Sequence, residues 1–177
     1  EGARAVPGTY KVRLKAAGIV QEHSFEILAD PRSNATSESF QAQFDFVQSV
    51  GKKLSEAHRA IKEIREVRKQ MKALTDGMTS NKELKSLTAY ATQTDSLMTS
   101  VEKALYQTQN RSSQDPLNFP VRLNDKLANI MGHNADGDFP PTQQSLDVRN
   151  HLFNLTDTEL NKWKDIKATR LPRLNQM

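Results

Sequence analysis

An apolar stripe through residues 36–76 constrains the fold of this chain more than any other feature. Its side chains recur every seven residues, with a second set interleaved three or four residues away, as on one face of a helix. The stripe consists of Phe40, Val47, Leu54 and Ile61, interleaved with Phe44 or Val50, Ala57, Ile64 and Met71. It predicts one helix that ends near Asp76 and Gly77 and is roughly 55–60 Å long. A helix of this length with one apolar face needs partner helices.

The residues that follow predict the first partner helix. Ser80 and Glu83 fit a capping box, in which the hydroxyl and the carboxylate satisfy amides of the first helical turn. Apolar or small residues then alternate at spacings of three and four: Leu84, Leu87, Ala91, Thr94, Met98, Val101 and Leu105. A short turn containing Gly77 would join the two long helices in an antiparallel pair.

Two shorter helices are predicted after a polar break at residues 110–116. The third helix would carry Phe119, Leu123, Leu127, Ile130 and Met131, and residues 132–141 would form a loop. Thr142 can cap the fourth helix, which ends before Pro172 because proline interrupts a helix. The apolar residues of that fourth helix are Leu146, Leu152, Leu155, Trp163 and Ile166.

Residues 7–30 have the alternating pattern of two β-strands instead. Tyr10, Val12 and Leu14 alternate with basic residues, and Phe25 and Ile27, with His23, continue the pattern beyond a reversal at residues 17–18. The second strand stops at residues 30–31, where proline has no N–H for a ladder. A lone two-stranded hairpin is marginal in water, so the following helices or strands upstream must cover its apolar face.

The sequence therefore predicts a mainly α protein: a bundle of about four helices, two of them long and antiparallel, preceded by a β-hairpin. We place the hairpin in residues 1–32 and the bundle in residues 33–177. The absence of Cys among the 177 residues excludes disulfides, zinc sites built on thiolates and cysteine nucleophiles. The chain begins at Glu1 with neither an initiator Met nor a signal sequence, which indicates a piece of something longer.

Residues 52–72 form the basic part of a chain whose net charge is only +4. Their cations are Lys52, Lys53, Arg59, Lys62, Arg65, Arg68, Lys69 and Lys72, set against Glu56, Glu63 and Glu66. Such a helix face could neutralise phosphates, and binding would then weaken steeply with salt. The interspersed Glu residues and the lack of interleaved aromatic residues favour a solvated helix flank. Polyanion binding through Arg65, Arg68 and Lys69 is the weaker alternative.

No constellation in the sequence predicts a metal, cofactor or catalytic site. Residues 133–138 place Asn134, Asp136 and Asp138 around Gly137, but a calcium loop needs further oxygen ligands and a terminal Glu. A polar turn between helices is the better interpretation. His58 and His151 lack a second ligand at helical spacing. Nucleophile-elbow, phosphate-loop and dinucleotide motifs are missing.

Five segments of the chain carry a family resemblance: residues 7–14, 25–32, 60–65, 113–120 and 141–142. Its specific parts are residues 30–32 and 114–120, whereas the heptads are not specific. Together these segments resemble the C-terminal region of large exported bacterial proteins with sortilin-like or sialidase-type β-propellers, usually labelled glycosyl hydrolase or Asp-box repeat proteins. The resemblance implies that the hairpin is the remnant of an immunoglobulin-like β-sandwich. It also implies export to the periplasm, the cell surface or the outside, with any glycosidase chemistry in an upstream propeller.

The first functional hypothesis is a non-catalytic structural or interaction module that docks to another exported protein or to upstream domains of its own chain. Its candidate contacts are the helix stripe at Phe40, Val47, Leu54, Ile61 and Ile64, and the strand edge at Tyr10, Val12 and Leu14. Completion of the hairpin sheet by another segment would be strand addition, and this idea fails if the hairpin pairs only with itself and lies exposed. The alternative is an accessory domain supporting a glycoside hydrolase site located upstream. No membrane span, nucleic acid or enzyme activity is expected for this segment.

Overall fold

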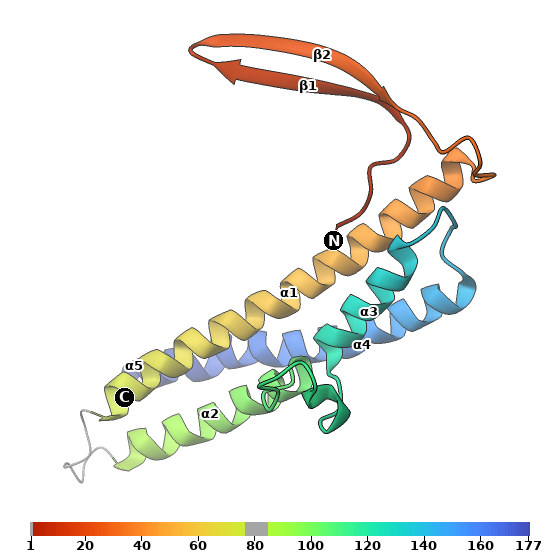
Figure 1. The fold of residues 1–177 in the computed structure, drawn as a ribbon. Coiled ribbons are helices and arrows are strands. Elements are labelled where there is room, and N and C mark those ends of the chain that lie inside the picture. The colour runs from red at the N-terminus through yellow and green to blue at the C-terminus, as the bar shows by residue number, and fades with distance from the viewer. Residues whose placement is uncertain (1, 77–84) are drawn as a thin grey trace.

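The computed structural model describes residues 2–76 and 85–177 and has one long helix at its centre. Helix α1 spans Ser37–Asp76 and has 40 residues, as the stripe predicts. Helix α2, Lys85–Leu105, returns antiparallel along one side of α1 (Figure 1). The predicted capping box at Ser80 and Glu83 lies outside the described residues. The antiparallel pair is therefore confirmed, and its turn is left undescribed.

Helices α3, Leu123–Ala135, and α4, Gln143–Asp165, complete the bundle around α1. The Thr142 hydroxyl accepts a hydrogen bond from the Ser145 N–H at 3.1 Å, so the predicted cap of α4 is confirmed. Two boundaries and one helix length differ from the prediction. Helix α3 begins after Phe119 and extends through Gly132 to Ala135. Helix α4 has 23 residues and is therefore not a short helix.

Helix α4 ends at Asp165, before Pro172 as predicted, but helical structure continues beyond it, which the sequence did not predict. A π-helical segment, Ile166–Arg170, follows α4 and leads into α5, Leu171–Gln176. Pro172 lies in the first turn of α5, where a missing N–H costs nothing. The Leu171 N–H donates to the Ile166 carbonyl, five residues back, and Leu171 packs against the core.

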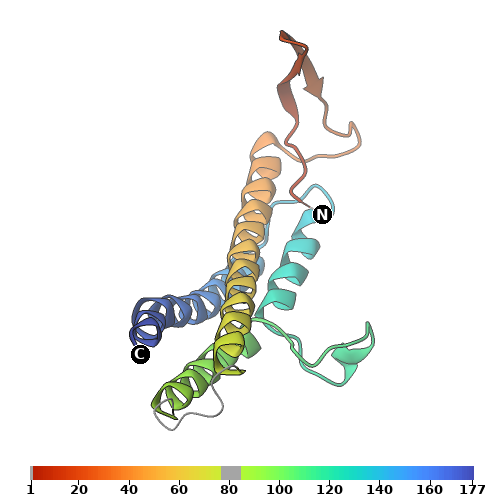
Figure 2. The ribbon, with the colours of Figure 1, turned by 90° about the vertical axis from the view of Figure 1, so that its left-hand side faces the viewer.

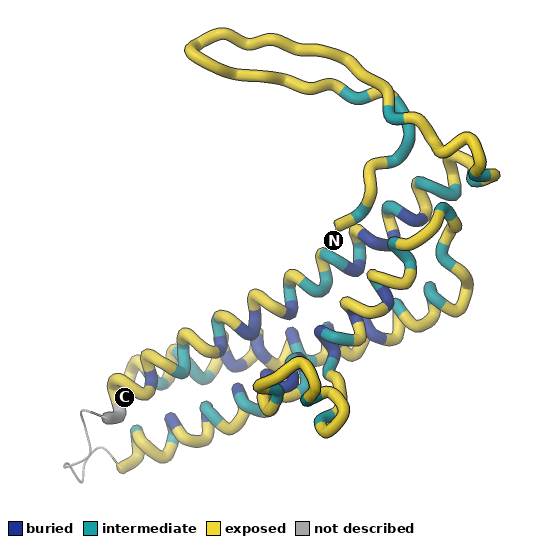
Figure 3. The backbone as a smooth tube through the Cα atoms, viewed as in Figure 1, coloured by how far each residue is buried: buried dark blue, intermediate teal, exposed yellow. Residues whose placement is uncertain are grey.

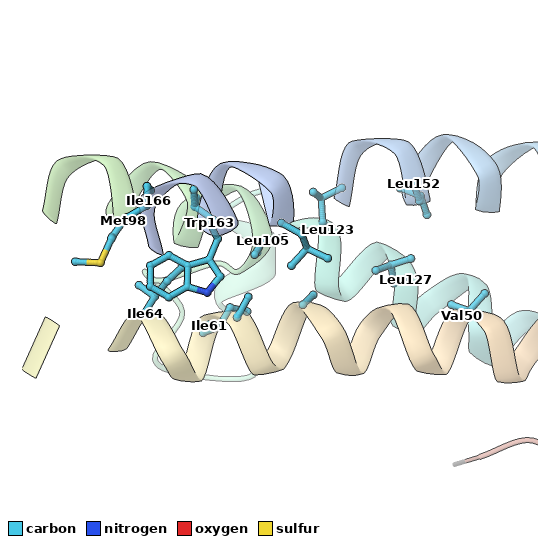
Figure 4. Packing of buried hydrophobic residues seen from close by; sticks show 14 of the residues in the cluster. Val50, Ile61, Ile64, Met98, Leu105, Leu123, Leu127, Leu152, Trp163 and Ile166 are labelled. Atoms are coloured by element: carbon cyan, nitrogen blue, oxygen red, sulfur yellow. The ribbon is translucent and has the colours of Figure 1, made fainter. Parts of the chain in front are cut away.

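The core lies along the inner face of α1, where α2, α3 and α4 converge on it. Figure 3 shows the buried positions on the helices that face one another, while the solvent sides are exposed. Figure 4 shows Trp163 of α4 directed toward Ile64 of α1, with Ile61 and Ile166 close by. The buried apolar residues include Phe46, Val47, Val50, Ile61, Ile64, Met98, Val101, Leu105, Leu127, Leu152, Trp163 and Ile166. The helical stripe is therefore the bundle's own core.

Strands β1, Gly8–Ala16, and β2, Ile19–Ile27, form the predicted antiparallel hairpin. Ala17 and Gly18 have φ values of 47° and 79°, as a tight hairpin turn requires. Among the described residues the two strands form a sheet of their own, and neither packs against a helix. The hairpin stands away from the bundle in two perpendicular views (Figures 1 and 2).

Candidate interaction surface

One face of the hairpin is mostly apolar, with His23 and Gln21 as its polar members, and is largely exposed. The strand register places Tyr10 opposite Phe25, Val12 opposite His23, Leu14 opposite Gln21, and Ala16 opposite Ile19. Side chains of directly paired residues lie on the same side of a sheet. We call these eight residues the hairpin face. Val12, Leu14, Ile19 and Phe25 are 51%, 64%, 64% and 44% exposed, so the apolar surface is open to solvent.

The opposite side of the hairpin is charged. Lys11, Arg13 and Lys15 of β1 alternate with the residues of the hairpin face. On β2, Glu22 lies opposite Arg13, and Glu26 lies opposite Thr9. The Arg13 Nε atom donates to the Glu22 carboxylate. The hairpin thus has one apolar side and one charged side, as expected of strands with one buried face.

The base of the hairpin is held in place on both strands. The Tyr10 hydroxyl donates to the Val6 carbonyl at 2.6 Å, and the Tyr10 and Phe25 rings stack with centroids 6.0 Å apart. Ala3, upstream of β1, packs against the bundle core. After β2, the Asp30 carboxylate accepts hydrogen bonds from the backbone and guanidinium of Arg32. These bonds hold the pKa of Asp30 below its usual value.

A cleft of about 660 Å³ lies where the hairpin meets the bundle. One wall is the segment from Asp30 to Ser39, and the other is the loop before α4, with Gly137, Asp138 and Phe139. The two walls belong to segments that the sequence singled out separately, residues 25–32 and residues 133–138. Their proximity depends on how α3 packs on α1, which no local pattern reveals. Sequence reasoning therefore missed this cleft.

The Gln43 side chain of α1 hydrogen-bonds the backbone at the end of α3 and in the loop before α4. Its side chain is 8% exposed, and its Nε2 atom donates to the carbonyls of Asn134 and Gly137 at 2.9 and 3.1 Å. A longer contact of 3.4 Å reaches the Asp136 carbonyl. Backbone carbonyls of residues 134–137 therefore accept hydrogen bonds from the Gln43 amide, as in a polar turn between helices.

Replacing Gln43 by Leu is expected to lower the free energy of unfolding by about 1–3 kcal/mol, because buried carbonyls lose their donor. Urea unfolding followed by circular dichroism measures the change. Gln41→Leu is the matched control, since the Gln41 amide bonds Asp45 on the exposed side of the same helix. A loss for Gln43→Leu no larger than the control value would contradict the role of Gln43.

The structure buries most of the helix stripe that the sequence offers as a contact surface. Val47, Ile61 and Ile64 are 2%, 4% and 0% exposed, and α2, α3 and α4 surround them. Phe40 and Leu54 are partly buried. Tyr10, Val12 and Leu14 lie on the exposed hairpin face. Of the two candidate surfaces, only the hairpin is free to meet a partner.

The cations proposed for polyanion binding are largely engaged within the bundle. The Arg65 Nε atom donates to Glu102 at 2.7 Å, and the Arg68 guanidinium donates to Glu102 at 2.6 Å and to Asp95 at 2.6 Å. Glu102 is 4% exposed. Burial favours the neutral acid, but the bonds from Arg68 and Arg65 outweigh it and hold the pKa of Glu102 below its usual value. Lys69 is exposed, so the expected trio presents one open cation.

Within residues 2–76 and 85–177, no three His, Asp or Glu side chains are grouped so that they could hold a metal ion. In the same ranges, no helix combines the length and the apolar character that crossing a membrane demands.

The chain matches no protein-family model, no curated protein and no solved structure.

Proposed function

We propose that this chain is a non-catalytic interaction module whose hairpin face packs against the apolar face of another β-sheet. The observation that carries the proposal is the hairpin face itself, with Val12, Leu14 and Ile19 each more than half exposed. Exposed apolar patches of this kind mark interaction sites. A two-stranded hairpin gains little stability alone, so a covering sheet also stabilises the hairpin.

A β-sheet fits this surface better than a helix or a small molecule. The hairpin face follows the period of two for nine residues on each strand, and it bears no Asp, Glu, Lys or Arg. Two sheets pack face to face by interdigitating such alternating side chains at a separation of about 10 Å. Within the described residues the hairpin pairs only with itself and lies exposed, so no other segment of this chain completes its sheet. Packing of the hairpin face against a second sheet does not require such a strand.

The bundle supports the hairpin in this proposal. Ala3, just before β1, packs against the bundle core, and the Asp30–Arg32 turn lies in the segment between β2 and α1. The bundle therefore anchors the chain on both sides of the hairpin. The sequence resemblance supports placing the covering sheet in upstream domains of the same exported protein.

Hydrogen exchange and native mass together test the proposal. In the isolated chain, the amides of β1 and β2 are expected to exchange far faster than those of α1 around Ile64. In the protein isolated from its source, the same strands are expected to be protected, within a particle heavier than the 19.9 kDa of this chain. A native particle of 19.9 kDa whose hairpin amides exchange rapidly would overturn the proposal.

The docking surface itself is tested by substitution. Val12→Asp with Leu14→Asp is expected to abolish the extra protection of the β1 and β2 amides in the native particle, because charged side chains oppose burial of the hairpin face. Leu117→Asp is the matched control, because Leu117 is an apolar residue that is 83% exposed and lies in the short 3₁₀ helix Asp115–Leu117, away from the hairpin. Equal effects of the two changes would contradict docking through the hairpin face.

A further inference from the structure

We infer that a partner strand adds to the outer edge of β1, and that this strand carries acidic side chains alternating with apolar ones. The inference rests on the proposed function and adds that the partner also extends the hairpin's own sheet by one strand of stated chemistry. It starts from the sheet order: among the described residues β1 pairs only with β2, so the backbone groups along its other edge have no strand partner. Strand addition to such an edge gains main-chain hydrogen bonds.

The charges on β1 select the strand that fits. Lys11, Arg13 and Lys15 are the charged residues of β1, and all three lie on the side opposite the hairpin face. Only Arg13 meets an acid across the hairpin, since Lys11 faces Ser24 and Lys15 faces Val20. A strand along the outer edge places side chains about 4.5–5.5 Å from these lysines. Acidic residues there are attracted, and basic residues are repelled.

The apolar side of the same strand must continue the hairpin face. Residues of β1 alternate between Val12 or Leu14 on one side and Lys11 or Lys15 on the other. An added strand that alternates with the same period of two, and pairs in the register that keeps its apolar residues on this side, therefore extends the apolar face beside Val12 and Leu14. The fitting strand alternates Val, Ile or Leu with Glu or Asp.

The edge of β2 is less selective. Its charged residues are Glu22, which already pairs with Arg13, and Glu26, which faces Thr9 near the base of the hairpin. The longest array of unpaired charge therefore lies on β1.

A second copy of this chain fits the edge of β1 poorly. Antiparallel pairing of two β1 strands would bring Lys11, Arg13 and Lys15 against the same cations, and like charges directly opposite are destabilising. Pairing β1 with β2 of another copy is a head-to-tail contact, which builds rings or open chains and not a closed two-fold dimer. The charge pattern thus favours a different, acidic strand.

The experiment uses the full 177-residue chain and two synthetic nine-residue peptides with fluorescent labels. One peptide alternates Val with Glu, and the other alternates Val with Lys. Fluorescence anisotropy at low salt measures binding, and amide NMR shifts locate it. The acidic peptide is expected to bind about tenfold tighter, because each favourable cross-strand pair adds a fraction of a kcal/mol and each like-charge pair costs as much. The largest shifts are expected in β1.

Charge reversal provides the decisive comparison. Lys11→Glu with Lys15→Glu is expected to reverse the preference, so that the basic peptide binds tighter. Lys52→Glu with Lys62→Glu makes the same charge change at exposed positions of α1 and is expected to leave the preference intact. Circular dichroism confirms that both variants fold, and Lys11→Gln with Lys15→Gln is expected to bind both peptides about equally.

Several outcomes would overturn the inference: equal binding of the two peptides to the unmodified chain, binding of neither, or shifts confined to β2. Concentration-dependent self-association that protects β1 would assign its edge to a second copy instead. Binding to phosphatidylglycerol vesicles with no peptide preference would assign the hairpin to a lipid surface. A hairpin protected in the native particle but indifferent to peptide charge refutes only the acidic strand, whereas an unprotected hairpin refutes the proposed function as well.

Discussion

Replacing Trp163 by Ala is expected to lower the free energy of unfolding by about 3–5 kcal/mol, the range for deleting a buried aromatic side chain. Trp163 is 2% exposed and lies between α4 and α1, against Ile64 (Figure 4). Its Nε1 atom also donates to the Glu63 carboxylate at 2.9 Å. The change therefore removes core volume and one hydrogen bond between the helices. Urea unfolding followed by far-ultraviolet circular dichroism measures it.

Two variants separate the contributions at this site. Trp163→Phe keeps an aromatic ring but removes the donor to Glu63, and its expected cost is nearer 1 kcal/mol. Leu155→Ala, on the same helix, is the control for general effects on α4, because Leu155 is 41% exposed. The sequence predicts both residues as core, whereas the structure buries only Trp163. A cost for Leu155→Ala as large as that for Trp163→Ala would contradict the packing described for α4.

Glu102→Gln is expected to lower the free energy of unfolding by about 1.5–3 kcal/mol at pH 7, the range for hydrogen bonds to charged groups, because its arginine partners stay partly exposed and Arg68 keeps Asp95. Glu102 accepts hydrogen bonds from Arg65 and Arg68, and its side chain is 5% exposed. The variant leaves both guanidinium groups without their shared carboxylate. Urea unfolding at a series of pH values measures the loss.

The lowered pKa of Glu102 gives that loss a definite pH dependence. A carboxyl group whose folded pKa is lowered contributes stability above its unfolded pKa of about 4.3 and loses it as the pH falls through the folded value. The difference between the unmodified chain and Glu102→Gln is therefore expected to be constant from about pH 5.5 to 8 and to narrow below about pH 4.3.

Asp157→Asn is the matched control for Glu102. Asp157 of α4 bonds Lys53 of α1 at 2.7 Å and thus also joins two helices, but its side chain is 48% exposed. Exposed ion pairs contribute about 1 kcal/mol or less. A loss for Glu102→Gln that is equally large at pH 3 and pH 7, or no larger than the loss for Asp157→Asn, would contradict the role of the buried pair.

Periodic patterns that extend over many residues predicted most of the fold. The stripe from Phe40 to Met71 predicted α1, because a seven-residue spacing repeated over many turns fits an α-helix and no other regular structure. The alternation around Tyr10 and Phe25 likewise predicted the hairpin. Helix boundaries were harder to predict where residues fit both a helix and a loop. Gly132 was predicted to begin a loop, yet it continues α3. Pro172 read as a helix stop, because a π-helical segment before it has no sequence signature of its own.

The surface was less predictable than the fold, because exposure depends on which elements pack together. Val47 and Val12 have similar side chains in similarly regular patterns, yet one is 2% and the other 51% exposed. Arg65 and Arg68 read as part of a basic helix face, since their partner Glu102 lies on another helix. The cleft near Asp138 required two segments roughly a hundred residues apart to meet.

The π-helical segment makes the C-terminal end of the chain sensitive to length rather than to side-chain identity. Its wider turn is closed by the hydrogen bond from the Leu171 N–H to the Ile166 carbonyl. Leu171 and Leu174 both pack on the core. On the next turns, the Arg170 and Arg173 guanidinium groups lie 5.0 and 5.2 Å from the Tyr90 ring of α2. One residue corresponds to about 100° of helix rotation. A chain shortened by one residue between Ile166 and Arg170 would therefore turn both leucines and both arginines away from the helices they now contact.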